Sequence, residues 1–267
     1  MLIDTHCHLE MMLQYEQIAT ISKENYQTVE KIIDDAKNNN VTTLVTIGTT
    51  YERCLHGVTF AQKYDPVFAT IGIHPCDITD SWQEELKKLA QLIPDKKNKI
   101  VGIGETGLDF YHPGFNVELQ KKVFRHQIEL ALTHNLAIVV HSRSAIDETL
   151  QILQEYKKNN LRGVIHCFGE NISVARDIQQ LNFMMGIAAI ITYPKNESLR
   201  DAVRTLQLDN MVFETDSPFL PPQHLRGKQN SPAQVYTVAQ YCAELLNLPL
   251  ETVAEKTTKH AQTLFQF

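Results

Sequence analysis

The sequence predicts a single α/β domain, a closed (β/α)8 barrel of the TIM type. Its 267 residues are close to the length of about 250 at which such barrels form one domain. Short apolar stretches rich in β-branched residues alternate with helical patterns along the whole chain. A doubly wound open sheet is the rival fold, but no glycine-rich dinucleotide loop follows the first strand. We therefore expect residues 1–267 to form one barrel domain.

The predicted strands are apolar on both sides, which is typical of strands buried in a parallel sheet. In chain order they are residues 1–3, 43–47, 67–73, 100–103, 137–140, 163–165, 183–191 and 211–213. Apolar residues at helical spacing predict helices over residues 120–132 and 235–246. Ser231 and Pro232 are predicted to be the N-cap and first residue of the second helix. Residues 218–232 are predicted to form a long loop, and residues 11–24 a small additional helix.

Composition excludes several classes of protein. Hydrophobic residues make up 43% of the chain and charged residues 21%, which is ordinary for a globular protein. No apolar run approaches the length of about 18 residues that a membrane-spanning helix needs. The start of the chain does not resemble a signal peptide, and the five cysteines form no C-x-x-C pair. We therefore expect a cytoplasmic protein without a disulfide framework or a membrane partner.

Histidine is unusually placed in this sequence. In an α/β barrel the active site forms at the carboxyl ends of the strands. Of the 11 histidines, those at predicted strand ends are His6, His8, His74, His141 and His166. Side chains two apart in a strand share a face, so His6 and His8 could reach one metal ion. The alternative for this pair alone is two exposed polar residues, but His141 and His166 at later strand ends favour a metal site.

Two carboxylates follow apolar strands, where burial would be costly unless they are paired or metal-bound. Glu105 could bridge two ions through its two oxygens, or form a salt bridge with Arg143. Asp216 could be a metal ligand, a helix N-cap or half of an ion pair. The sequence leaves three roles for His74: a metal ligand, a donor to a substrate oxygen or a hydrogen-bonded wall residue.

The remaining histidines and the cysteines are expected to have no role in the chemistry. Cys7 and Cys167 are next to candidate ligands, and neighbours in a strand point to opposite faces, so both thiols should pack outward as small hydrophobes. The other histidines fall in predicted helices or loops, and most of them are expected to pack or to lie on the surface. They are His56, His112, His126, His134, His224 and His260.

Six motifs in a fixed order resemble one known family. They are Asp4-Thr5-His6-Cys7-His8-Leu9, Gly72-Ile73-His74-Pro75, Gly104-Glu105-Thr106-Gly107-Leu108-Asp109, His141-Ser142-Arg143, His166-Cys167-Phe168 and Glu214-Thr215-Asp216-Ser217-Pro218, and Arg226-Gly227-Lys228-x-Asn230-x-Pro232 follows them. From residue 2 to about 265, the sequence resembles the TatD family of metal-dependent deoxyribonucleases, within the amidohydrolase-like barrels. One departure is His260, which occupies a position where the family often has Asn.

The resemblance implies a barrel that binds two divalent metal ions. By motif, His6, His8 and Asp216 would hold one ion, His141 and His166 the other, and Glu105 would bridge them. His74, Arg143, Arg226 and Lys228 would face the substrate phosphates. Mixed histidine and carboxylate ligands admit Mg, Mn or Zn. Two such ions would make the cavity locally cationic in a chain whose net charge is −6, and so compatible with an anionic substrate.

Family members are described as nucleases acting on DNA, often from the 3′ end. The resemblance therefore implies a DNA phosphodiesterase in which Glu105 and Asp216 are catalytic, with Asp216 orienting the attacking water and accepting its proton. A second hypothesis is a D-aminoacyl-tRNA deacylase, lactonase or amidohydrolase that uses the same site. A third is a barrel that binds nucleic acid or a partner without catalysis. The basic loop with Arg226 and Lys228 favours a phosphate-bearing substrate.

Overall fold

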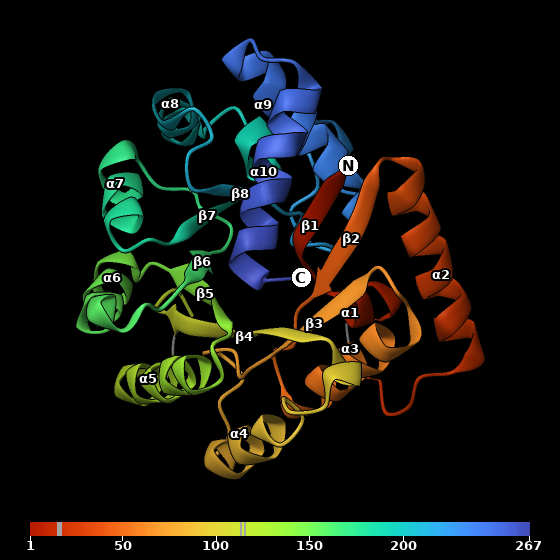
Figure 1. Ribbon diagram of the computed structural model, residues 1–267, viewed down its shortest axis with the longest axis vertical. Helices are drawn as coiled ribbons and strands as arrows, with labels where there is room; N and C mark the ends of the chain where they lie inside the picture. The colour runs from red at the N-terminus through yellow and green to blue at the C-terminus, as the bar shows by residue number, and fades with distance from the viewer. Residues whose placement is uncertain (15–17, 113, 115) are drawn as a thin grey trace.

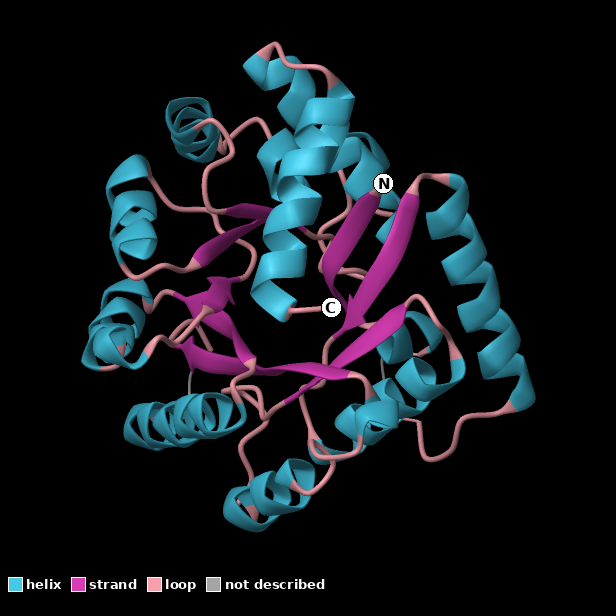
Figure 2. Cartoon of the chain, viewed as in Figure 1, coloured by secondary structure: helices cyan, strands magenta, loops and turns pink. Residues whose placement is uncertain are grey.

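A computed structural model describes residues 1–14, 18–112, 114 and 116–267. All eight strands are parallel and follow the chain order β1 to β8 around the sheet, with helices outside the ring (Figure 1, Figure 2). The strands are β1 Leu2–Cys7, β2 Val41–Thr46, β3 Val67–Ile71, β4 Ile100–Asp109, β5 Ala137–Arg143, β6 Gly163–Ile165, β7 Met184–Ile187 and β8 Met211–Phe213. This topology confirms the predicted (β/α)8 barrel.

Strand bounds differ from the predictions mainly at the carboxyl ends. β1 continues to Cys7 and β4 to Asp109, because polar side chains there are buried and paired although they interrupt the apolar pattern. β7 is shorter than the predicted strand, since the chain turns after Ile187 into the 3-10 helix η3, Ala189–Thr192. Apolar residues continue through that turn because they remain buried.

The barrel closes between β1 and the segment that follows β8. The backbone N–H of Asp216 donates to His6 O over 2.8 Å, and that of His8 donates to Ser217 O over 2.8 Å. Asp4 reinforces this junction, because its carboxylate accepts hydrogen bonds from the Thr215 hydroxyl and from the backbone N–H groups of Thr215 and His6. Residues more than 200 positions apart in the sequence are thereby held side by side.

The helices connect consecutive strands and cover the barrel. They are α1 Leu9–Leu13, α2 Lys23–Asn38, α3 Tyr51–Lys63, α4 Trp82–Ala90, α5 Val117–His134, α6 Ile146–Glu155, α7 Ile172–Gln180, α8 Glu197–Leu206, α9 Val235–Leu246 and α10 Leu250–Phe265, with further 3-10 turns η1 Lys96–Asn98, η2 Lys157–Asn159, η4 Gln223–Leu225 and η5 Pro232–Gln234. The predicted bounds of α9 are confirmed, and α5 extends its predicted helix at both ends. Asn116 caps α5 by accepting from Leu119 N, a cap that satisfies an otherwise free N–H.

Three predictions, for one helix cap, one loop and one short helix, need correction. Ser231 precedes the 3-10 turn η5 and its side chain makes no capping hydrogen bond, so it does not cap α9 directly. The predicted loop 218–232 contains η4 and the start of η5. The predicted helix over 11–24 corresponds in part to α1, which begins earlier, at Leu9, and α2 begins at Lys23. Residues 15–17 of that segment lie outside the described part of the chain.

The barrel interior is apolar at its amino end and polar at its carboxyl end. Val45, Val101, Val139 and Val212 point inward and form one buried cluster with Phe265 of α10. α10 lies across the amino-end opening of the ring of strands (Figure 1). His260 on the same helix donates a hydrogen bond from its Nδ1–H to Met211 O over 2.9 Å. None of the described helices has the length and apolar character to cross a membrane.

Candidate metal centre

Six potential ligands converge at the carboxyl end of the barrel, although they come from five places in the chain. They are His6 and His8 at the end of β1, Glu105 in β4, His141 in β5, His166 after β6 and Asp216 after β8. A cavity of about 280 Å³ is lined by all of them except His6, which lies fully buried beneath it. The structure therefore brings together every metal ligand predicted from the sequence.

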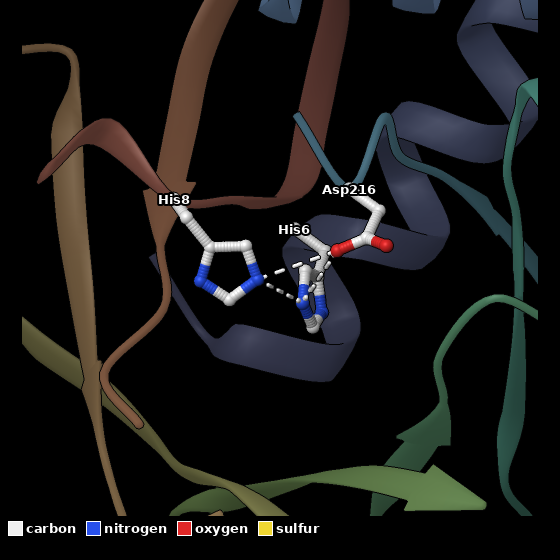
Figure 3. Close-up of side chains that lie close together, drawn as sticks. All are labelled: His6, His8 and Asp216. Atoms are coloured by element: carbon white, nitrogen blue, oxygen red, sulfur yellow. Dashed lines mark hydrogen bonds and ion pairs between the residues drawn. The ribbon is translucent and has the colours of Figure 1, made fainter. Parts of the chain in front are cut away.

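His6, His8 and Asp216 form the first ligand set (Figure 3). The Nε2 atoms of the two histidines are 3.2 Å apart, and Asp216 Oδ1 lies 3.6 Å from His6 Nε2 and 3.3 Å from His8 Nε2. Asp216 adopts a left-handed backbone conformation with φ of 56°, which Asp tolerates better than most residues. All three ligand atoms thus face one point.

Glu105 lies between this set and the other two histidines. Its Oε1 is 3.0 Å from His141 Nδ1 and 2.8 Å from His166 Nε2. Its Oε2 is 3.4 Å from His6 Nε2 and 3.8 Å from His8 Nε2. The two carboxylate oxygens therefore face different pairs of imidazoles. Glu105 interacts with these histidines rather than with Arg143, whose guanidinium stacks on the Tyr111 ring with its Cζ 3.9 Å from the ring centroid.

The protein environment favours ionised carboxylates at this position. Burial alone would raise the pKa of Glu105, but the charge of His166 and hydrogen bonds from His141 and His166 outweigh burial and hold that pKa well below its usual range. Burial would also raise the pKa of Asp216, but the hydrogen bond from His8 and the charge of His6 outweigh burial and lower this pKa. Both carboxylates are therefore available as anionic ligands.

The imidazoles divide into two classes. Burial and the charge of His166 lower the pKa of His6. Burial would also lower the pKa of His166, but the charge of Glu105 and its hydrogen bond outweigh burial and raise the pKa of His166 well above the usual range. Without a metal, protons on such histidines compensate the buried carboxylates. A divalent cation can replace those protons, since metal ligands bind in their deprotonated form.

The donor set fits a divalent cation for a second reason. Among the described residues, the Nδ1 atoms of His6, His8 and His166 have no hydrogen-bond partner, while their Nε2 atoms all face the carboxylates of Glu105 or Asp216. Four imidazoles and two carboxylates in one pocket match the ligands preferred by Zn, Mn and Fe and, through the carboxylates, by harder cations. We conclude that the site is suited to metal binding on its own geometry.

His74 faces the same cavity in a different role. The backbone N–H of Cys76 donates to His74 Nδ1 over 3.1 Å, so in the neutral ring the proton is on Nε2. Burial lowers the pKa of His74 to about 3 against the opposing charge of Glu105, and the ring is therefore neutral. Its Nε2–H points toward Glu105 Oε1, 3.7 Å away. Of the alternatives left open by the sequence, this arrangement favours a hydrogen-bond donor.

Two further carboxylates contact the ligand histidines on the side that faces away from Glu105. In the sequence they were identified only as members of motifs, without a role. Asp109 Oδ2 lies 3.0 Å from His141 Nε2, which directs the lone pair of Nδ1 toward Glu105. Glu214 Oε1 accepts from Cys167 N and is 3.7 Å from His166 Nδ1. A Cβ on Gly186 would collide with the Glu214 carboxylate, so the glycine leaves room for it. The sequence signal that could have identified these two supporting residues is a carboxylate at the end of a predicted strand, which Asp109 and Glu214 share with Glu105.

The two cysteines beside the ligands behave differently from each other. Cys7 is fully buried with its Sγ 3.5 Å from Val45 O, as expected for outward packing. The prediction for Cys167 is wrong, because its side chain lines a cavity of about 450 Å³ together with His166, Asp216 and Phe219. β6 ends at Ile165, and Cys167 lies in a turn with φ of 48°, where strand alternation no longer applies.

The cationic residues predicted to face substrate are placed at different distances from the cavity. Arg143 lines both cavities at the mouth. Arg226 and Lys228 are exposed on the loop after β8 and line neither of them. The guanidinium of Arg226 stacks on the Tyr193 ring, 4.8 Å from its centroid. These two residues could thus contact only the outer part of a long substrate.

Comparison with known proteins identifies the family. The model of the family described as TatD related DNase matches residues 3–266. The chain belongs to the TatD family. It is 34% identical over 267 residues to the uncharacterized metal-dependent hydrolase YabD of Bacillus subtilis, covering 100% of this chain and 99% of that protein. It is 35% identical to the uncharacterized metal-dependent hydrolase YcfH of Escherichia coli, with coverages of 99% and 95%.

Solved structures agree with this assignment. The crystal structure of YJJV, a TatD homolog from Escherichia coli, superposes with a TM-score of 0.88 at 27% identity and covers 100% of this chain and 98% of that one. A TatD family hydrolase from Entamoeba histolytica has a TM-score of 0.81 at 18% identity, with coverages of 99% and 97%, and so shows the common fold. This chain is accordingly a TatD-family metal-dependent hydrolase.

Proposed function

We propose that this TatD protein is a deoxyribonuclease that hydrolyses DNA phosphodiesters with two divalent ions, Mg, Mn or Zn. The observation that carries the proposal is the division of Glu105 between two sets of imidazoles. Oε2 faces His6 and His8, which Asp216 completes, and Oε1 faces His141 and His166. A carboxylate placed between two ligand sets could be shared by two divalent ions, which together would supply the chemistry of a two-metal hydrolase.

Bound divalent ions would activate water at neutral pH and stabilise charge on the phosphoryl oxygens. Asp216 has an ionised carboxylate that reaches the cavity, and we assign it the orientation of the attacking water and acceptance of its proton. His74 supplies a neutral Nε2–H donor for a phosphoryl oxygen. Arg143 at the mouth neutralises a neighbouring phosphate, since guanidinium groups bind phosphate oxygens in pairs of hydrogen bonds.

Exposed aromatic rings beside these cations favour a nucleic acid over a small ester. Tyr111 is 61% exposed and Phe219 is 39% exposed, and Phe219 lines both cavities. Bases stack on such rings with little sequence preference. Together with Arg143, they provide contacts for phosphates and bases outside the reacting group. We propose that the substrate is single-stranded DNA and that the enzyme cleaves it from the 3′ end.

The test is hydrolysis of oligonucleotides labelled at either end, with added Mg, Mn or Zn and with EDTA. The proposal predicts metal-dependent release of single nucleotides from the 3′ end. D-Aminoacyl-tRNA and a simple lactone are assayed in parallel, because a deacylase or amidohydrolase would use the same ligands. Faster hydrolysis of either ester than of DNA would overturn the nuclease assignment while leaving the metal centre intact.

A further inference from the structure

A separate cluster of ligand-type side chains lies at the rim of the same cavity. Cys76 follows His74 after β3, and His112 follows Asp109 at the end of β4. One ligand atom from each of Cys76, Asp109 and His112 lies within 4.8 Å of the others. This set shares no residue with the six ligands described above. His112 was expected only to pack or to lie on the surface.

The distances from His112 to the other two residues are close to those between ligands of one tetrahedral ion. His112 Nδ1 lies 3.3 Å from both carboxylate oxygens of Asp109, and Cys76 Sγ lies 3.9 Å from the same nitrogen. Zinc bonds of about 2.0–2.3 Å at tetrahedral angles place ligand atoms roughly 3.3–3.6 Å apart. The His112–Asp109 and His112–Cys76 distances are within a few tenths of an ångström of that range, and the Cys76–Asp109 pair lies within 4.8 Å.

One residue of the cluster is buried and held by hydrogen bonds, and the other two are accessible to solvent. Asp109 is buried, with a side chain only 1% exposed, and its Oδ1 accepts from the backbone N–H groups of Tyr111 and His112. The side chain of His112 is 46% exposed, and Cys76 is half-buried. An ion from solvent could therefore reach three donors, one of them rigidly held, and keep a fourth position for water.

Local charge favours a cation at this position. Burial and the charges of Asp109 and Asp77 raise the pKa of the Cys76 thiol to about 12, while Arg143 opposes this weakly. A metal ion reverses such an effect, because it binds the thiolate directly and deprotonates it outright. Thiolate with imidazole and carboxylate selects zinc-like ions over magnesium.

We propose that Cys76, Asp109 and His112 form a separate rim site for a thiophilic divalent cation of the Zn²⁺, Co²⁺ or Cd²⁺ class. The site does not depend on the reaction proposed above. It is connected to the central cluster through one atom, since Asp109 Oδ2 lies 3.3 Å from His112 Nδ1 and 3.0 Å from His141 Nε2. An ion at the rim would therefore compete with His141 for this carboxylate.

Cobalt provides a readout that does not depend on activity, because a thiolate bound to Co²⁺ gives a ligand-to-metal charge-transfer absorption that histidine and carboxylate ligands lack. The metal-free protein is titrated with Co²⁺ under reducing conditions. We expect the thiolate band in the parent protein, its loss in Cys76→Ser and at least about 10–100-fold weaker binding of this ion in His112→Ala, by analogy with the loss of supporting groups at metal sites.

Two control variants separate the rim site from other sources of the signal. Cys167→Ser removes the thiol that lines a cavity with His166 and Asp216, and His134→Ala removes a histidine at the end of α5, at the other end of the barrel. Both should keep the band. Zn²⁺ should also slow alkylation of Cys76 but not of Cys167. Absence of the band in the parent protein, its persistence in Cys76→Ser, or its loss in Cys167→Ser would overturn the proposal.

Discussion

The carboxylate of Asp109 lies 3.0 Å from Nε2 of His141, on the side of the ring that faces away from Glu105. This contact fixes both the tautomer and the rotation of a candidate metal ligand, as supporting carboxylates commonly do. Burial opposes ionisation of Asp109, but the hydrogen bond from His141 and those from the backbone outweigh it and keep its pKa low. The position of His141 therefore depends on a residue that does not itself face Glu105.

Asp109→Asn should weaken metal binding and turnover by about 10–100-fold, the usual effect of removing such a supporting partner. The amide keeps the size of the side chain but not its charge. Metal affinity by competition with a chelating dye, and turnover on an oligonucleotide, are the two measurements. The exposed Asp34→Asn on α2 is the matched control. Unchanged metal affinity in Asp109→Asn would show that the contact has no supporting role.

Glu105→Ala should cost more activity than His74→Ala. The first change removes a group that faces four imidazoles, so both proposed ions lose a ligand. The second removes a donor to substrate and leaves every proposed ligand in place. Bound metal per chain and turnover should be determined for each variant. Two tightly held ions in Glu105→Ala would rule out its bridging role.

Chelation should abolish hydrolysis and lower the melting temperature together, and excess divalent ion should restore both. An ion that binds only the folded state stabilises it by about 2.7 kcal/mol when its concentration is 100 times its Kd. Activity is assayed and unfolding followed by calorimetry on the same EDTA-treated samples. Full activity in a preparation shown by elemental analysis to be metal-free would contradict metal dependence.

The double change Arg226→Ala with Lys228→Ala should raise KM for oligonucleotides and flatten its dependence on salt, since fewer phosphate contacts release fewer counterions. Because neither residue lines the central cavities, hydrolysis of a small chromogenic phosphodiester should hardly change. The measurement is KM against salt concentration for both substrates. Equal losses on the two substrates would mean that the loop has a structural role instead.

Asp4→Ala should destabilise the fold by roughly 1–3 kcal/mol for each buried hydrogen-bond donor that it leaves unpaired. Three such donors, the Thr215 hydroxyl and two backbone N–H groups, lose their acceptor at the junction of β1 and the segment after β8. Urea unfolding in EDTA measures this term without the contribution of metal. Asp34→Ala, at an exposed position, should be neutral by comparison.

The fold and the convergence of the candidate ligands were predictable because both rest on local patterns, whereas the assignment of those ligands to two ions came from the resemblance to a known family. Apolar runs located the strands, and the residues that follow such runs in a barrel converge at its carboxyl end, as His141 and His166 do. The position of Cys167 was not predictable, since it depends on where β6 stops and on a left-handed backbone. The support of His141 by Asp109 depends on the register between β4 and β5, which no local pattern contains.

The packing of α10 across the amino end of the ring of strands also bears on how this enzyme exchanges its ligands. Phe265 and the inward valines fill that end with buried apolar side chains, so a polynucleotide cannot pass through the barrel. If the substrate is DNA, as we propose, a DNA end would enter and the released nucleotide would leave through the same opening, past Arg143 and Phe219. On this proposal, substrate and product would use one passage in turn, and accumulated nucleotide would compete with the next DNA end.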